Sequence, residues 1–319
     1  MDPHPRRSIC RTLPLVLKQR LIFGPILLAI LFAILWLDEW LDAQSIPEAW
    51  RDWWPGISPT YPAGAILLLV GLLVVPLAAR ELARIFHAGG IQASKRWLAM
   101  AAMAGLLVSA AVPRQSSSVN AVALVATVGT AVLIASLLWH IRGRNLQGAT
   151  AAVGAALFAF IYLGLMFGFI LAIRREHSAW VVLGVLVVTK SCDIGAYFTG
   201  RLVGRHKLIP WVSPGKTWEG LIGGLVLAAT VAYLGLRLAR SSGAEEVREI
   251  ASMSTWFAIL SGVLFGITGQ AGDLLASVLK RDARIKDSGQ TLPGFGGILD
   301  VVDSVMLVAP VAFWLLKPR

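Results

Sequence analysis

The sequence predicts an all-α fold: a polytopic membrane helical bundle of about nine transmembrane helices, with a polar cavity in the C-terminal helices. Composition is the first indication, because 56% of the 319 residues are hydrophobic, only 15% are charged, and the mean hydropathy is +0.71. Soluble domains are typically about 45–50% apolar and about 25% charged. The second indication is a succession of apolar stretches of about 20 residues, the length at which a helix crosses the hydrocarbon core.

The expected spans follow one another with short connectors. We interpret the first as an uncleaved anchor rather than a signal peptide, because no small-residue cleavage pattern follows it. The nine stretches are 21–37, 62–79, 97–113, 119–140, 148–173, 178–200, 218–238, 254–280 and 297–316. The last four hold almost all the polar residues, so we divide the chain into N-terminal membrane helices (1–177) and a C-terminal catalytic membrane domain (178–319).

Loop charge predicts the orientation. Lysine and arginine concentrate in the N-terminal arm and in the loops after the second, fourth, sixth and eighth spans, which nine crossings place on one side. The positive-inside rule makes that side cytoplasmic. Arg174 and Arg175 are exceptions on the opposite side. The net charge of +11 fits cationic loops beside anionic lipid. Nucleic acid is not an expected partner, because no basic soluble domain is apparent.

Two expected spans carry ionisable residues along one face. In the sixth span these are Lys190, Asp193, Tyr197 and Arg201, at helical steps of three and four. In the eighth they include Asp273, and a charged loop follows that span. Charges inside a membrane are costly and usually mark function. The alternatives are a Lys190–Asp193 ion pair that only packs the bundle, or a structural polar seam in the eighth span.

The segment before the ninth span combines glycines and acids. Gly294, Gly296 and Gly297 could let backbone N–H groups close on an anion. Asp300 and Asp303 follow at an i, i+3 spacing, and paired carboxylates near phosphate-binding cations suit Mg²⁺. The alternative for these acids is simple capping of a helix N-terminus.

The loop after the sixth span contains Gly-Lys-Thr, which invites a phosphate-binding-loop interpretation. Pro210 stands where that pattern requires glycine, so we exclude it. Instead we predict Ser213 as an N-cap with Pro214 at the first helical position, so that Lys216 projects at a helix start. Glu81 and Arg84, after the second span, are interpreted as a solvated face.

These two blocks resemble the phosphatidate cytidylyltransferase family, also called CDP-diacylglycerol synthases. The C-terminal signature is matched by Ser277, Lys280, Arg281, Lys286, Asp287, Pro293, Gly296, Gly297, Asp300 and Asp303. The upstream block is matched by Asp193, Gly195, Ala196, Tyr197, Gly200, Arg201, Ser213, Pro214, Lys216, Thr217, Glu219 and Gly220. The chain departs from the family pattern at Phe295, where the signature has His, at Val301, where it has Arg, and at Ala276, where an acid is common.

The resemblance implies that CTP and phosphatidate react to give CDP-diacylglycerol and pyrophosphate in phospholipid biosynthesis, at a bacterial-type inner (plasma) membrane. The implied catalytic residues are Asp273, Lys280, Arg281, Lys286, Asp287 and Asp300. The implied substrate-binding residues are Asp193, Tyr197, Arg201, Ser213, Lys216, Thr217, Glu219, Gly296 and Gly297. Asp273, Asp300 and Asp303 are the implied Mg²⁺ ligands.

Three matters stay open at this point. The departures at Phe295 and Val301 leave room for an inactive paralogue or one acting on another lipid. An ion-coupled transporter would use Lys190, Asp193 and Asp273 along a path, although these charges gather near glycine-rich loops instead. The sequence does not decide on a homodimer, a second, monovalent cation or the acyl preference.

Overall fold

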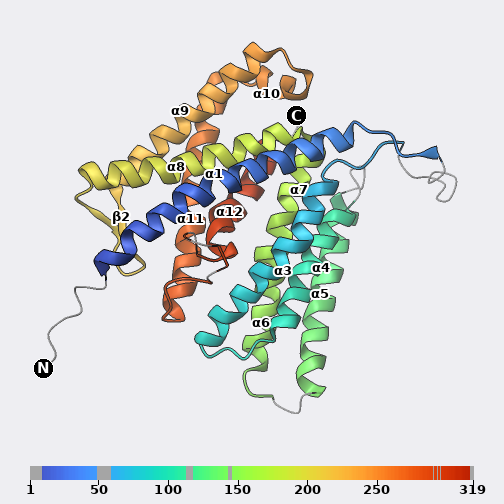
Figure 1. Cartoon of the computed structure of the whole chain (residues 1–319). Coiled ribbons are helices and arrows are strands. Elements are labelled where there is room, and N and C mark those ends of the chain that lie inside the picture. The colour runs from blue at the N-terminus through green and yellow to red at the C-terminus, as the bar shows by residue number, and fades with distance from the viewer. Residues whose placement is uncertain are drawn as a thin grey trace, which may run out of the picture.

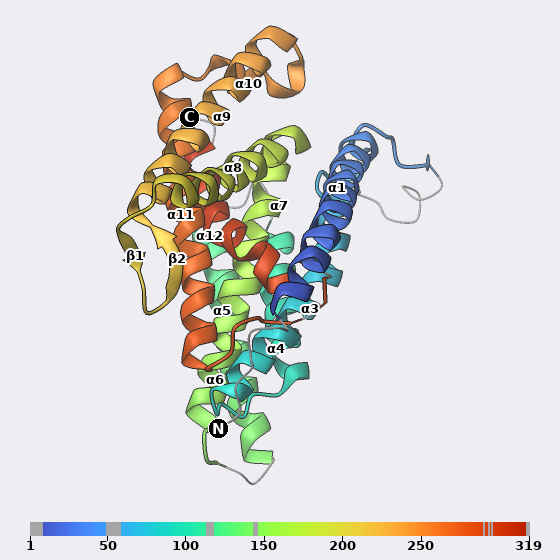
Figure 2. The same ribbon diagram turned by 60° about the vertical axis from the view of Figure 1, so that its left-hand side comes forward.

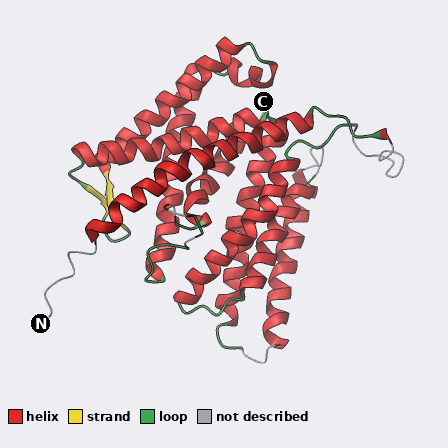
Figure 3. Ribbon diagram, in the orientation of Figure 1, coloured by secondary structure: helices red, strands yellow, loops and turns green. Residues whose placement is uncertain are grey.

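The computed structural model describes residues 9–48, 59–112, 118–142, 146–289, 291–292, 294 and 296–316. Long helices make up nearly all of this part, and the named strands form a single two-stranded hairpin (Figures 1 and 3). The first half contains α1 (Ile9–Asp42), α3 (Ala65–Ala88), α4 (Lys95–Ala111), α5 (Ser118–Arg142), α6 (Ala149–Ala159), the π-helix η1 (Phe160–Leu165) and α7 (Met166–Glu176). The second contains α8 (Ala179–Val203), β1 (Lys207–Ile209), β2 (Ser213–Thr217), α9 (Trp218–Ser242), the 3₁₀ turn η2 (Glu245–Val247), α10 (Arg248–Ser252), α11 (Thr255–Asp282) and α12 (Ile298–Leu316).

The expectation of an all-α membrane bundle is confirmed, and the chain is an integral membrane protein. Within the described residues, eight helical segments are long and apolar enough to cross a membrane. The expected third span forms α4, which has 17 residues and is not among the eight. Helix α4 packs against α3 and η1.

The helices fall into two sets. In Figure 1, α3 to α7 stand side by side, whereas α1, α8 and α9 are inclined to them. Figure 2 shows the hairpin at the edge of the molecule, beside α8, α9 and α11. Helix α9 packs along α8, and α11 packs against α8, α9 and α12. Helix α12 also contacts α7 and α3, so it joins the two sets.

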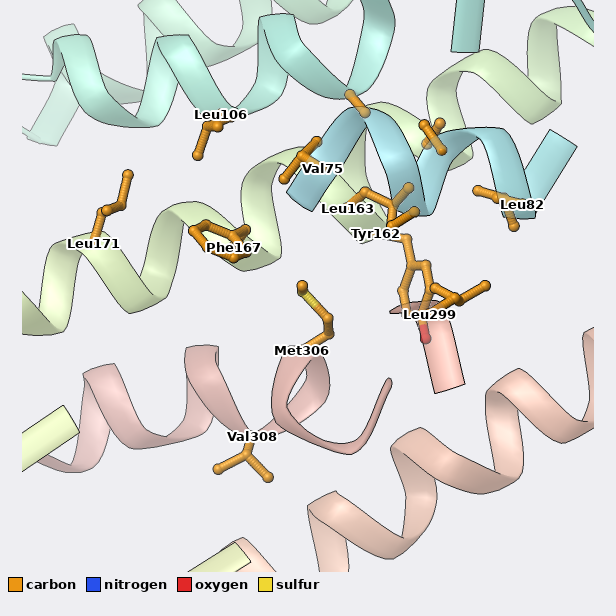
Figure 4. Packing of buried hydrophobic residues seen from close by; sticks show 14 of the residues in the cluster. Val75, Leu82, Leu106, Tyr162, Leu163, Phe167, Leu171, Leu299, Met306 and Val308 are labelled. Atoms are coloured by element: carbon orange, nitrogen blue, oxygen red, sulfur yellow. The ribbon is translucent and has the colours of Figure 1, made fainter. Parts of the chain in front are cut away.

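A continuous hydrophobic core runs through both halves of the chain. Figure 4 shows Met306 of α12 facing Phe167 of α7 and Leu163 of η1. Close helix packing depends on small residues: a Cβ on Gly105 of α4 would lie 2.4 Å from the carbonyl oxygen of Phe160. The boundary at residue 177 therefore does not coincide with a break in the core.

The first half also contains buried charge, although the sequence places almost all the polar residues in the last four expected spans. Arg174 is buried, and its Nε lies 2.5 Å from Oδ2 of Asp38. Its Nη2 lies 3.1 Å from Glu39 and 3.2 Å from Asp42. This network explains the cation on the unexpected side: Arg174 pairs with three acids at the end of α1, and so ties α7 to α1.

Candidate functional site

The β-hairpin lies where a helix start was expected. Strands β1 and β2 are antiparallel, with Lys207 opposite Thr217 and Ile209 opposite Ser213. The prediction of Ser213 as a helix N-cap is therefore wrong. Thr217 is the N-cap of α9, and its side chain accepts a hydrogen bond from the N–H of Gly220 at 3.1 Å. The error arose because Ser-Pro is a common helix-start pattern, whereas here Pro214 continues a short strand.

Two of the predicted site residues hold this hairpin in place. Glu219 accepts hydrogen bonds from the N–H groups of Arg205 and His206 at 3.1 and 3.2 Å, and pairs with His206 Nδ1 at 2.6 Å. Arg281 of α11 donates from Nε to the carbonyl oxygen of Val212, near the tip of the hairpin, at 3.2 Å. An isolated two-stranded hairpin is marginal in water, so these contacts stabilise its position.

Polar side chains from α8, β2 and α11 meet in one group, here called the central cluster: Lys190, Asp193, Lys216, Gln270 and Asp273. Lys216 Nζ lies 2.7 Å from Oδ2 of Asp273 and 2.8 Å from Oε1 of Gln270. Gln270 Nε2 donates to Oδ1 of Asp193 at 2.9 Å, and Lys190 pairs with Oδ2 of the same carboxylate at 3.4 Å. The hairpin therefore brings Lys216 to residues that are more than 50 positions away in the chain.

The central cluster extends to α12. Lys190 Nζ donates to Oγ of Ser304 at 2.6 Å. The neighbouring Asp303 is buried, and both Asp303 and Asp193 interact electrostatically with Asp273. Ser304 and Gln270 were not among the predicted site residues, although Gln270 shares a helical face with Asp273. The arrangement brings two lysines near three carboxylates. Lysines suit phosphate, and Mg²⁺ needs only one or two carboxylates when waters and substrate phosphates complete its shell.

A second group, the loop cluster, surrounds the N-terminus of α12 and contains Glu81, Lys280, Ser288, Gly297 and Asp300. Lys280 Nζ lies 2.7 Å from Oδ1 of Asp300. Asp300 Oδ2 accepts from the N–H of Gly297 at 2.9 Å, and from Ser288 through its hydroxyl at 2.8 Å and its N–H at 3.3 Å. Asp300 thus satisfies four donors, three of them in the loop that precedes α12.

The predicted glycines serve the fold of this loop. Gly296 has φ +91°, a backbone conformation that favours glycine, and its N–H donates to the carbonyl oxygen of Leu292 at 3.1 Å. A Cβ on Gly297 would lie 2.1 Å from Oγ of Ser288 and 2.3 Å from Oε2 of Glu81. The N–H of Gly296 donates to Leu292 and that of Gly297 donates to Asp300, so these two groups do not form the expected anion cradle here.

The interpretation of Glu81 as part of a solvated face is wrong. Glu81 is buried, and its carboxylate accepts four hydrogen bonds from the loop before α12 and from the start of that helix. The helical periodicity held the missing signal, because Glu81 lies three residues after Ala78 and four before Ile85, and both are buried.

Four further predicted residues are exposed. Arg201 and Tyr197 are exposed on α8, and Arg201 Nη1 donates to the Tyr197 hydroxyl at 3.0 Å. Lys286 and Asp287 are exposed in the loop after α11. Pro293 and Phe295 lie outside the described residues. Of the other departures from the family pattern, Val301 is half-buried in α12 and Ala276 is buried in α11.

Tyr162, in the π-helix η1, is a further residue that the sequence did not single out. Its hydroxyl is the one buried side-chain polar atom in the described part of the chain with no hydrogen-bond partner. Figure 4 shows its ring extending toward Leu299, and the group interacts electrostatically with Asp303 and Asp273. Single-turn π-helical segments are frequent at functional sites.

The three predicted metal ligands do not form one ligand set. Among the described residues, no group of three or more His, Cys, Asp or Glu side chains is arranged to hold a metal ion. Asp273 pairs with Lys216 and Asp300 with Lys280, whereas Asp303 accepts from the N–H of Ser304 at 2.6 Å.

Comparisons with known proteins cover most of the chain. A model of the cytidylyltransferase family matches residues 58–318. A phosphatidate cytidylyltransferase of Staphylococcus haemolyticus is 39% identical over 155 residues, which are 49% of this chain and 55% of that protein. One from Haemophilus influenzae is 39% identical over 161 residues, 48% of this chain and 54% of that protein. The uncharacterized protein YnbB of Escherichia coli is 41% identical over 142 residues, 44% of each chain.

The chain thus spans about half the length of the curated relatives it matches. The family model also covers the helices that carry Glu81 and Tyr162.

Proposed function

Because this chain belongs to the cytidylyltransferase family, we propose that it transfers the cytidylyl group of CTP to phosphatidate, releasing pyrophosphate and forming CDP-diacylglycerol. The observation that carries this proposal is the central cluster. It gathers Lys190, Lys216, Asp193 and Asp273 within membrane helices and one hairpin strand. Two relatives that share about half of the chain are named phosphatidate cytidylyltransferases.

The proposed reaction is an in-line displacement at phosphorus. A phosphate oxygen of the lipid attacks the α-phosphorus of CTP, and the bond from that phosphorus to the oxygen bridging to the β-phosphate breaks. Both reactants are anions, so the protein contributes mainly positioning and charge neutralisation. Lys190 and Lys216 are the cations nearest the carboxylates of the central cluster, and we assign to them the phosphates of nucleotide and lipid.

The residues present fit Mg²⁺, which usually takes one or two carboxylates, several waters and the substrate phosphates. We propose Asp273 as its main protein ligand, with Asp303 or Asp193 beside it. Asp300 fits this role less well, because its oxygens already accept four hydrogen bonds. When bound, the ion neutralises charge that develops on the phosphates.

The proposed orientation places both clusters at the cytoplasmic side, where CTP is available. The C-terminal half of α3 contacts the loop after α11 through Glu81 and Ser288, and the end of α11 contacts the loop after α8 through Arg281 and Val212. The segments that follow the expected second, sixth and eighth spans are rich in lysine and arginine, which the positive-inside rule places in the cytoplasm. Phosphatidate would then reach the cluster from the surrounding bilayer.

Product formation tests the proposal. Purified protein in lipid nanodiscs is given CTP, Mg²⁺ and phosphatidate, and the lipid fraction is analysed for CDP-diacylglycerol by mass spectrometry. We expect product only when both substrates and Mg²⁺ are present. Val301 differs from the family pattern, so a second candidate function is the same transfer to another lipid phosphate. Product from another acceptor and none from phosphatidate would favour that candidate, whereas no nucleotidyl transfer to any lipid would contradict both.

A further inference from the structure

We propose that Glu81 is a positioning residue: it orients the loop before α12, and through Ser288 it holds Asp300 and Lys280 in place. Glu81 belongs to α3, more than 200 residues before the loop it contacts. This proposal rests on the proposed function, because the turnover measured below is the formation of CDP-diacylglycerol.

The contacts of Glu81 divide between its two carboxylate oxygens. Oε1 accepts from the Thr291 hydroxyl at 2.5 Å and from the N–H of Ile298 at 3.1 Å. Oε2 accepts from the Ser288 hydroxyl at 3.2 Å and from the N–H of Leu299 at 2.9 Å. A carboxylate has about four acceptor sites, so the loop and the helix end use its full capacity.

The charge of Glu81 is stabilised by this geometry. Among the described residues, no lysine, arginine or histidine nitrogen lies within 4.0 Å of the Glu81 carboxylate. Asp300, in contrast, forms an ion pair with Lys280. The negative charge of Glu81 is instead stabilised by the first N–H groups of α12, which carry the partial positive charge of a helix N-terminus. A buried carboxylate bound in this way fixes the start of α12 relative to α3.

Ser288 connects Glu81 to Asp300. Its hydroxyl oxygen lies 2.8 Å from Oδ2 of Asp300 and 3.2 Å from Oε2 of Glu81. A serine hydroxyl has one proton, and both carboxylates only accept, so the proton is shared between them. Asp300 in turn pairs with Lys280 at 2.7 Å. A shift of Glu81 is therefore transmitted through Ser288 to a lysine–aspartate pair.

The space around the carboxylate leaves little freedom. A Cβ on Gly289 would lie 2.7 Å from Oε1 of Glu81, and one on Gly297 would lie 2.3 Å from Oε2. The loop backbone is thus packed directly against Glu81 on two sides. Glycines therefore flank the predicted catalytic acids because the backbone packs closely there. This explanation fits the structure better than an anion cradle does.

The test compares Glu81→Gln, Ser288→Ala and their double variant with wild type. Glutamine keeps the size of the side chain, but its amide nitrogen cannot accept from an N–H of α12. We expect kcat for CDP-diacylglycerol formation to fall about 10- to 100-fold, the range seen when a supporting partner of a site is removed. KM for CTP should stay unchanged, because Glu81 does not touch the central cluster.

Two readouts separate positioning from simple loss of fold. The double variant should show no larger loss of kcat than the more severely affected single variant, because both substitutions remove the contact between Glu81 and Ser288. Amide hydrogen exchange of residues 296–300 should be faster in Glu81→Gln, while exchange in α8 stays as in wild type. Glu245→Gln is the matched control, since Glu245 is exposed and pairs only with Arg248 on the next turn.

Wild-type kcat in Glu81→Gln, additive losses in the double variant, or unchanged exchange at residues 296–300 would each overturn the proposal. If the wild type forms no nucleotidyl lipid at all, the proposed function is wrong. The exchange measurement still decides whether Glu81 orders the loop.

Discussion

Two lysine–aspartate ion pairs in this protein have the same nitrogen–oxygen distance but differ in how exposed the aspartate is. Lys216–Asp273 and Lys280–Asp300 both join nitrogen and oxygen at 2.7 Å. In the first pair the aspartate side chain is 37% exposed, and in the second it is 14% exposed. Asp300 also accepts three hydrogen bonds from its own loop, whereas Asp273 lies in a cluster of other charges.

The difference teaches that matching a motif residue does not by itself assign it a role. Asp273 and Asp300 were both predicted as catalytic residues and metal ligands, yet the Asp273 carboxylate is the more accessible one and lies beside other carboxylates and Lys216. Asp300 is committed to holding the loop that Glu81 also holds. We therefore expect changes at the central cluster to affect chemistry, and changes at the loop cluster to affect both order and chemistry.

Among the variants that test this comparison away from Asp273 itself, the largest effect is expected for Lys216→Met. Methionine keeps most of the aliphatic stem but removes the charge that faces Asp273. We expect kcat/KM for CTP to fall about 10²- to 10³-fold, the loss typical when one preorganised charge-stabilising group is removed. Steady-state kinetics in nanodiscs would measure this.

Lys207→Met is the matched control for that change. Lys207 lies on the same hairpin but is exposed, and its Nζ donates only to the carbonyl oxygen of Pro214. Its kinetics should stay close to wild type. Equal losses in the two variants would mean that hairpin integrity, and not the position of Lys216, is what matters.

Asp300→Asn should combine a moderate kinetic effect with lower stability. Asparagine can accept with one oxygen only, so buried donors lose their partners, at about 1–3 kcal/mol. We expect a lower Tm in detergent and a loss of turnover of about 10-fold. Asp282→Asn, at an exposed position, serves as control. An unchanged Tm would show that Asp300 does not stabilise the loop.

The smallest effect is expected for Tyr162→Phe. The hydroxyl of Tyr162 is buried without a hydrogen-bond partner, so its removal should leave Tm unchanged or slightly higher. Tyr233→Phe, which removes a hydroxyl bonded to Arg237 at 3.2 Å, is the comparison. A clear drop in the Tm of Tyr162→Phe would show that the hydroxyl has a partner such as buried water.

Much of this architecture could be predicted from the sequence, because bilayer thickness sets the length of apolar stretches. Each expected span corresponds to a helix, although α4 is shorter than a typical span. The face shared by Lys190 and Asp193 also follows from helical spacing alone, and their ion pair at 3.4 Å agrees with it.

What could not be predicted depends on contacts between distant segments. The Ser-Pro pattern at residue 213 gave no sign of a strand, because the hairpin is fixed by Glu219 and Arg281 rather than by local preference. Burial of Arg174 depends on three acids at the end of α1. Periodicity alone cannot show which partner a buried side chain finds.

The most direct test of the account is turnover by Asp273→Asn, measured as pyrophosphate release with CTP, Mg²⁺ and phosphatidate. The account predicts a loss of about 10³-fold, because several kcal/mol of charge stabilisation would go with the carboxylate. Size-exclusion behaviour and Tm should stay close to wild type, since Asp273 is partly exposed. Turnover near the wild-type rate in a folded Asp273→Asn protein would contradict the assignment of the central cluster as the site of transfer.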